Sequence, residues 1–158
     1  MKYQIDQSGK IEQTERHTVL ACTNSEEITI LLTKREKRKL QKIFRITNSS
    51  KLFPLLVFAA LLAVLIKKLN PRQKIIVDRE YAGHEGLVEE KATIYLQQLR
   101  IGFMPLIEFG HIGKLSNPHK LAYLVAVGKK KPTIIVSANE VMKVILGIKK
   151  DRDRLTQD

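Results

Sequence analysis

The feature that most limits how this chain folds is an uninterrupted apolar run, LFPLLVFAALLAVLI, from Leu52 to Ile66. As a helix the run is about 22 Å long at ~1.5 Å per residue, which falls short of the ~30 Å hydrocarbon core of a bilayer. Its flanks are basic on both sides, at Lys51 and at Lys67 with Lys68, so no charge asymmetry orients a membrane span. A helix covered by a sheet and by other helices is apolar all round. We therefore favour a buried core helix, with a membrane span as the alternative.

Three strands are expected before this helix, over residues 2–7, 11–23 and 27–34. The links between them are short and contain the turn residues Ser8-Gly9 and Asn24-Ser25. Strands joined by such links form an antiparallel meander. The first half of the predicted sheet is therefore local in sequence.

The second half of the chain alternates strands with helices. Apolar runs end at Asp78 and near Gly110, and each is followed by residues at helical spacing. This order adds a parallel pair of strands to the meander. The expected elements are a strand at 75–78, a helix after Gly83 that includes 87–99, a strand within 104–113, a helix over 116–128 and a helix that starts at the capping box Ser137-Ala-Asn-Glu140 and runs to Gly147. For the helix over 116–128 we expect Ser116 or Asn117 as the cap and Pro118 in the first turn.

The length of 158 residues suits one domain with a real core. We expect that domain over residues 1–148 and a charged, flexible tail over 149–158. The single cysteine, Cys22, forms no internal disulfide, and the sequence has no cysteine cluster for zinc. The N-terminus carries no apolar stretch of the secretory type. These features favour a cytoplasmic location.

Lys and Arg total 28 against 16 Asp and Glu, which gives a net charge of +12. Such a charge attracts phosphates, either in nucleic acid or in anionic lipid head groups. The helix predicted within 34–45 is basic on most of its surface, which suits either solvent or phosphate. The run 129–131 also suits the negative end of a helix dipole. The candidate phosphate contacts are Lys37, Arg38, Lys42, Lys114, Lys129 and Lys130.

The predicted order of elements resembles the ribonuclease-H-like fold, in a family that includes Holliday-junction resolvases and the Piwi module of Argonaute proteins. Three stretches carry the resemblance. YQIDQSG at 3–9 resembles the family's aspartate on strand one, and IIVDREY at 75–81 resembles its acidic position on strand four. SNPHKLAYLVAVGKKKP at 116–132 is similar to the helix on which some members place an acidic or histidine ligand, here His119. The expected fold is an α/β ribonuclease-H-like mixed sheet with flanking helices, one of them a fully apolar central helix.

The resemblance implies that Asp6 and Asp78 lie side by side, because strand one of this fold is central and adjacent to strand four. Two close carboxylates raise each other's pKa and are held ionised by a shared cation. Oxygen ligands suit Mg²⁺ or Mn²⁺, which support phosphodiester hydrolysis. His119 would be a third ligand or a proton-transfer group, so the catalytic set is Asp6, Asp78 and His119, and the metal ligands are Asp6 and Asp78.

One family feature is missing. Residues 51–69 contain no acid to match the glutamate that many members carry on the first helix. Glu80, Glu85 or Glu108 could replace it.

Each candidate residue also has an ordinary alternative role. Asp6 could instead begin an Asx turn, Asp78 could cap the loop before the next helix, and His119 could be a partly exposed polar residue.

Nucleic acid is the expected partner and Mg or Mn the expected cofactor. The leading hypothesis is a metal-dependent nuclease, and whether the site is catalytic stays open. The alternatives are a non-catalytic nucleic-acid-binding protein of the same fold and a small membrane-anchored basic protein. The sequence lacks Gly-rich, Walker, Gly-x-Ser-x-Gly and His-Glu-x-x-His motifs, so a nucleotide cofactor is not expected. A homodimer is expected only by analogy with resolvases.

Overall fold

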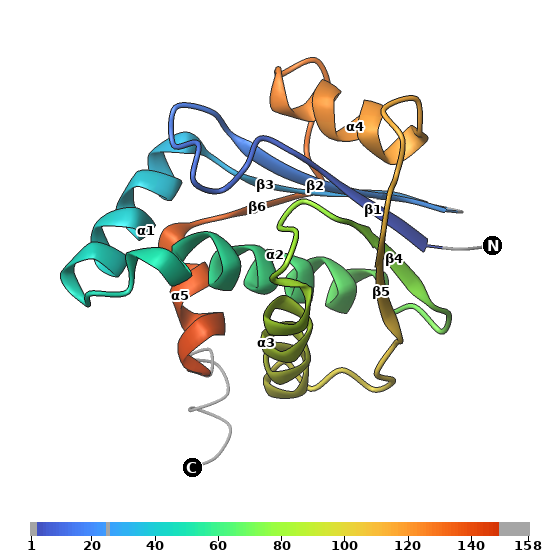
Figure 1. Ribbon diagram of the computed structural model, residues 1–158. Coiled ribbons are helices and arrows are strands. Elements are labelled where there is room, and N and C mark those ends of the chain that lie inside the picture. The colour runs from blue at the N-terminus through green and yellow to red at the C-terminus, as the bar shows by residue number, and fades with distance from the viewer. Residues whose placement is uncertain (1–2, 25, 149–158) are drawn as a thin grey trace, which may run out of the picture.

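A six-stranded mixed sheet with helices on both faces forms the frame of the computed structural model, which describes residues 3–24 and 26–148 (Figure 1). The strand order is β5-β4-β1-β2-β3-β6. The tail expected at 149–158 lies outside the described residues. The elements are β1 (Tyr3–Ser8), β2 (Thr18–Thr23), β3 (Glu27–Leu32), α1 (Lys34–Ile46), a 3₁₀ turn (Ser50–Leu52), α2 (Phe53–Leu69), β4 (Ile75–Asp78), α3 (Glu85–Gln98), β5 (Ile107–Gly110), α4 (Asn117–Ala126), β6 (Ile134–Val136) and α5 (Ala138–Leu146).

Strand β1 lies inside the sheet, antiparallel to β2 on one side and parallel to β4 on the other. Strands β2 and β3 pair antiparallel, and β4 and β5 pair parallel. The predicted meander and the predicted parallel pair are therefore confirmed. Strand β6 is an addition that the sequence reading did not identify, a three-residue strand parallel to β3 at the far edge of the sheet.

The apolar run forms helix α2, which packs under one face of the sheet and against α3 (Figure 1). Most of its residues are buried in the main core. The ring centroid of Phe58 lies 5.1 Å from that of Tyr81. The segment Ser50–Leu69 is long and apolar enough to cross a membrane, but here most of it is buried inside the protein. The favoured reading as a core helix agrees with this packing.

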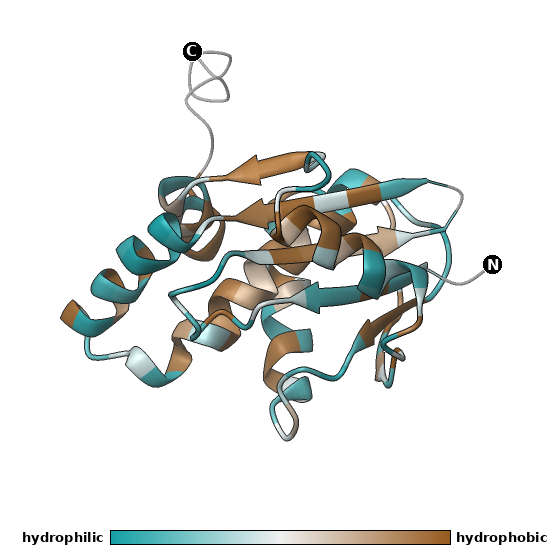
Figure 2. Cartoon of the chain, turned by 90° about the horizontal axis from the view of Figure 1, so that it is seen from above, coloured by the Kyte–Doolittle hydropathy of each residue, from teal (hydrophilic) through white to brown (hydrophobic). Residues whose placement is uncertain are grey.

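Helix α4 covers the opposite face over β1 and β2. A small second core joins the two layers, with Val19 and Ala21 from β2 against Leu121, Ala122 and Val125 from α4. Figure 2 shows β1 as a largely hydrophilic strand among hydrophobic neighbours. Because successive side chains of a strand point to opposite faces, β1 gives Ile5 to the main core and Asp6 to the face under α4.

The strand expected over 11–23 is wrong in its first part, since β2 begins at Thr18 and residues 11–17 form turns. The carbonyls of Lys10 and Gln13 accept hydrogen bonds from Lys37 at 3.0 Å and 2.6 Å instead of pairing in the sheet. Gly9 has a φ of +76°, and a Cβ there would stand 2.1 Å from the carbonyl oxygen of His17. A glycine is therefore required where the chain leaves β1.

The expectation that Lys37 contacts phosphates is corrected by this geometry. Its side chain is fully buried, and its ammonium also donates to Thr18 Oγ1 at 2.9 Å. Burial lowers the pKa of Lys37 to about 8. The sequence grouped Lys37 with the basic surface of the helix, but in the structure it lies on the buried face of α1 with Leu40 and Phe44 and ties the turns at 11–17 to the helix.

We expect Lys37→Ala to lower the free energy of unfolding by about 2–4 kcal/mol, because the substitution leaves a cavity and because two carbonyls and the buried Thr18 hydroxyl lose their donor. Urea denaturation of the variant measures this loss. Arg38→Ala is the matched control, since Arg38 is the exposed neighbour on the same helix, and it should change stability by less than about 0.5 kcal/mol. Equal effects of the two substitutions would contradict the structural role of Lys37.

Candidate metal centre

The pairing of β1 with β4 brings two carboxylates to the same place. Ile5 is the register partner of Val77, and both side chains belong to the main core. The next residue of each strand, Asp6 and Asp78, therefore points to the opposite face. Because the strands are parallel, Glu80 follows Asp78 at the edge where β1 also ends. The adjacency expected for Asp6 and Asp78 is present in the structure.

Asp6, Asp78 and Glu80 form one acidic cluster. Each offers a carboxylate oxygen, and these three atoms lie within 4.8 Å of one another. Asp6 is only 2% exposed, and the other two side chains are half-buried. A single cation between them would contact all three, and the purely oxygen donor set suits Mg²⁺ or Mn²⁺ better than zinc.

Backbone and side-chain donors hold the two aspartates in place. Asp6 Oδ1 accepts a hydrogen bond from the Gln7 amide at 2.7 Å, and Asp78 Oδ1 accepts one from the Ile112 amide at 2.7 Å. Asp6 Oδ2 lies 2.8 Å from Nδ1 of His119. These contacts fix the carboxylate directions, as outer partners of metal ligands do.

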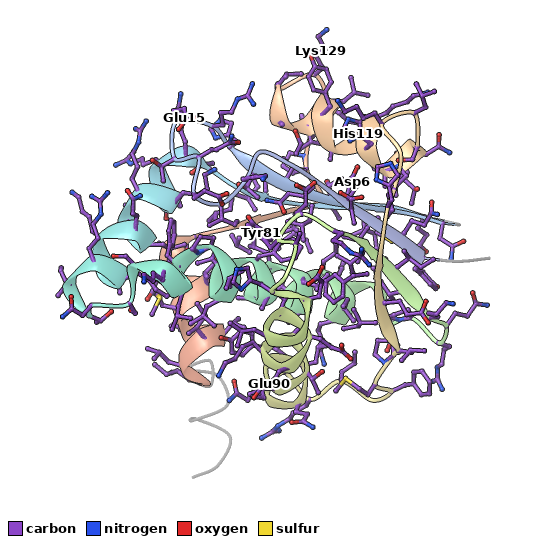
Figure 3. All side chains as sticks on the ribbon, in the orientation of Figure 1. Asp6, Glu15, Tyr81, Glu90, His119 and Lys129 are labelled. Carbon is purple, nitrogen blue, oxygen red and sulfur yellow. The ribbon has the colours of Figure 1, made fainter. Side chains whose placement is uncertain are left out.

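His119 reaches Asp6 from the first turn of α4 (Figure 3). Ser116 caps this helix by accepting from the His119 amide at 3.4 Å, and Pro118 suits the first turn. The cap and the turn predicted from the sequence are both present. The side chain of His119 stays 35% exposed, so part of its ring is in contact with solvent.

The electrostatics of the cluster follow from burial and from like charges. Burial raises the pKa of Asp6, although the bonds from Gln7 and His119 oppose the rise. Burial also raises the pKa of Glu80 to about 7, with further contributions from the hydrogen bond and charge of Asp78. Burial therefore disfavours the ionised forms of Asp6 and Glu80 in the protein alone, and a bound divalent cation would offset that cost.

The sequence offered three glutamates as candidates for the third carboxylate of the site, and the structure places one of them there. Glu80 lies in the cluster. Glu85 instead pairs with Arg79 at 3.3 Å, and Glu108 pairs with Lys74 at 3.2 Å. His119 contacts Asp6, but the third cluster carboxylate belongs to Glu80.

Tyr81 is a contributor that sequence reasoning missed. Its hydroxyl accepts from the Ile11 amide at 3.0 Å and from Gln7 Nε2 at 3.3 Å, and its ring packs on Phe58. Figure 3 shows Tyr81 between the sheet and α2. The residue fixes the backbone directly after Glu80. An aromatic residue immediately after Asp-x-Glu was the available signal, but its partners are distant in sequence.

The remaining basic candidates lie on the surface, spread over several elements. Lys114 is exposed in the loop before α4, and Arg38 and Lys42 are exposed on α1. Lys129 is exposed at the end of α4 away from His119 (Figure 3). Lys130 is also exposed, and its ammonium pairs with Glu27. Of these, Lys114 is closest in the chain to the segment that bonds Asp78.

We expect metal-free protein to lose stability as pH rises through about 7, because the raised pKa of Glu80 favours the folded state only while Glu80 is protonated. This contribution is complete below the ordinary value of 4.5 and absent above the folded value. Glu80→Gln should therefore be more stable than the natural protein at pH 8 by about 1 kcal/mol and equal to it at pH 4.

Thermal unfolding in EDTA between pH 4 and pH 8 measures the difference. Glu89→Gln, at an exposed position of α3, is the control and should follow the natural protein at every pH. A Glu80→Gln protein with an unchanged pH profile would show that Glu80 is not held against the two aspartates.

No protein-family model, no curated protein and no solved structure matches this chain. The acidic cluster, the contacts that orient it and the charge of the surface around it are therefore the features that bear on its function.

Proposed function

We propose that this protein is a metal-dependent nuclease of ribonuclease-H-like fold. The strand order β5-β4-β1-β2-β3, with β2 antiparallel between β1 and β3, supports the fold assignment. The position of α4 on the face opposite α2, with His119 in its first turn, supports it further. The observation that carries the function is the Asp6, Asp78 and Glu80 cluster in a chain of net charge +12.

Each residue of the site has a distinct task in this proposal. Asp6, Asp78 and Glu80 would hold Mg²⁺ or Mn²⁺, which when bound activates water and stabilises the leaving oxygen of a phosphodiester. Asp6 is kept in its direction by the Gln7 amide and by His119. His119 is a positioning residue for Asp6, and its exposed ring edge lies where a proton can be exchanged with solvent.

The charge of the surface favours a polyanionic substrate. Lys10 lies close enough to lower the pKa of Glu80, which opposes the effect of burial. Lys114 is exposed in the loop that supplies the Ile112 amide to Asp78. Cations beside an acidic metal site offset the repulsion between its carboxylates and a phosphate backbone.

We expect Asp6→Asn, Asp78→Asn and Glu80→Gln each to lower cleavage in Mg²⁺ or Mn²⁺ more than about 100-fold, because each removes one of three ligands. His119→Ala should cost about 10- to 100-fold, since it removes only a partner of Asp6. The measurement is cleavage of labelled single-stranded, duplex and branched DNA and RNA. Glu89→Gln is the control and should cleave normally.

Metal binding is measured separately, as the rise in Tm on adding MnCl₂. The natural protein and Glu89→Gln should be stabilised, and the three ligand variants should not. Full cleavage by Asp6→Asn would contradict the catalytic assignment. Salt-dependent nucleic-acid binding that is unchanged by EDTA, with no cleavage by the natural protein, would instead indicate a non-catalytic binding protein.

A further inference from the structure

A groove lies next to the acidic cluster, on the same side of β1 as α4. It is a cavity of about 280 Å³ between α4, the turns after β1 and the start of α1. Arg16, His17 and Lys34 line one side, and Tyr123 with the end of α4 lines the other. Ser8 and Gly9 also line it. We call this feature the α4 groove.

The α4 groove begins where the acidic cluster ends. Ser8 lies two residues beyond Asp6 on the same face of β1, a distance of about 7 Å along a strand. Helix α4 follows the same direction, because His119 contacts Asp6 and Tyr123, one turn later, lines the cavity with Ser8. The groove and the cluster therefore lie next to each other along β1 and α4.

The groove presents hydrogen-bond donors and positive charge. Arg16 and Lys34 are exposed cations. His17 Nδ1 accepts a hydrogen bond from the Lys34 amide at 2.9 Å, so in the neutral ring the proton is on Nε2, which is then a donor. Among the described residues that line the groove, Glu15 is the acidic one, and it is exposed at the rim. The balance of charge favours an anion.

The wall opposite these donors is aromatic and apolar. Tyr123 is 53% exposed and Val127 is 48% exposed, although both are large and hydrophobic. An exposed aromatic beside cations is the combination that single strands bind, since an unpaired base stacks on the ring while its phosphate meets the cation. Bases inside a duplex are already stacked and offer no free face.

We propose that the α4 groove binds single-stranded nucleic acid. A base stacks on Tyr123, flanking phosphates contact Arg16 and Lys34, and the strand continues past Ser8 to the acidic cluster. This inference rests on the proposed function, because it names the substrate class of that cluster as a single strand or a single-stranded part of a larger nucleic acid.

The test is fluorescence anisotropy of a labelled oligothymidylate and of a labelled blunt duplex, measured in EDTA so that no cleavage occurs. The natural protein should bind the single strand at least tenfold more tightly. Tyr123→Ala should weaken single-strand binding about 5- to 100-fold, because one stacked base is lost. Tyr123→Phe keeps the ring and should bind as the natural protein does.

The cations are tested by the salt dependence of the same binding. Arg16→Ala and Lys34→Ala should each weaken binding and reduce the salt slope by about 0.7, the value for one phosphate contact on a single strand. Lys68→Ala removes an exposed lysine at the end of α2 and is the control for net charge. It should leave the slope within error of the natural value.

Equal affinity for strand and duplex, or Tyr123→Ala binding like the natural protein, would overturn the inference. Asp6→Asn separates this failure from failure of the proposed function, since Asp6 does not line the groove and the variant should keep the preference for the single strand but not cleave. If the groove variants weaken single-strand binding but the natural protein shows no metal-dependent cleavage, the groove assignment stands and the nuclease assignment is wrong. If the natural protein cleaves and Tyr123→Ala cleaves equally well, the nuclease assignment stands and the groove assignment is wrong.

Discussion

The parallel pairing of β1 with β4 is the interaction on which the candidate site depends. It sets Ile5 beside Val77 in the core, and it thereby sets Asp6 beside Asp78 on the other face. A shift of one residue would send a carboxylate into the apolar layer over α2. The large hydrophobic core formed with α2 therefore fixes the register, and the register fixes the distance between the acids.

The same pairing explains why a central strand carries an aspartate. Burying a carboxylate costs free energy unless it is hydrogen-bonded or neutralised. Asp6 has a backbone amide and His119 as partners, but Asp78 and Glu80 add negative charge to the same place. A protein that keeps this arrangement gives up stability at neutral pH, and binding a divalent cation would recover it.

Much of this arrangement is predictable from sequence, because it depends on local patterns. Turn residues indicated the meander, and the capping residues Ser116 and Ser137 indicated helix starts. The adjacency of Asp6 and Asp78 came from the resemblance to the ribonuclease-H-like order of elements. Glu80 was not separable from Glu85 and Glu108, since the choice depends on the neighbours Arg79 and Lys74 of the latter two. Lys37 and Tyr81 were misread or missed because their partners lie in the turns after β1, far from them in sequence.

A crystal structure of the protein soaked in MnCl₂ tests the central claim most directly. Anomalous scattering locates manganese without reference to activity. The result expected is one peak between Asp6, Asp78 and Glu80, with oxygen ligands at roughly 2.0–2.2 Å, the range of small divalent cations. Carboxylates that stay apart with no peak between them, or manganese bound only at other acidic residues, would contradict it.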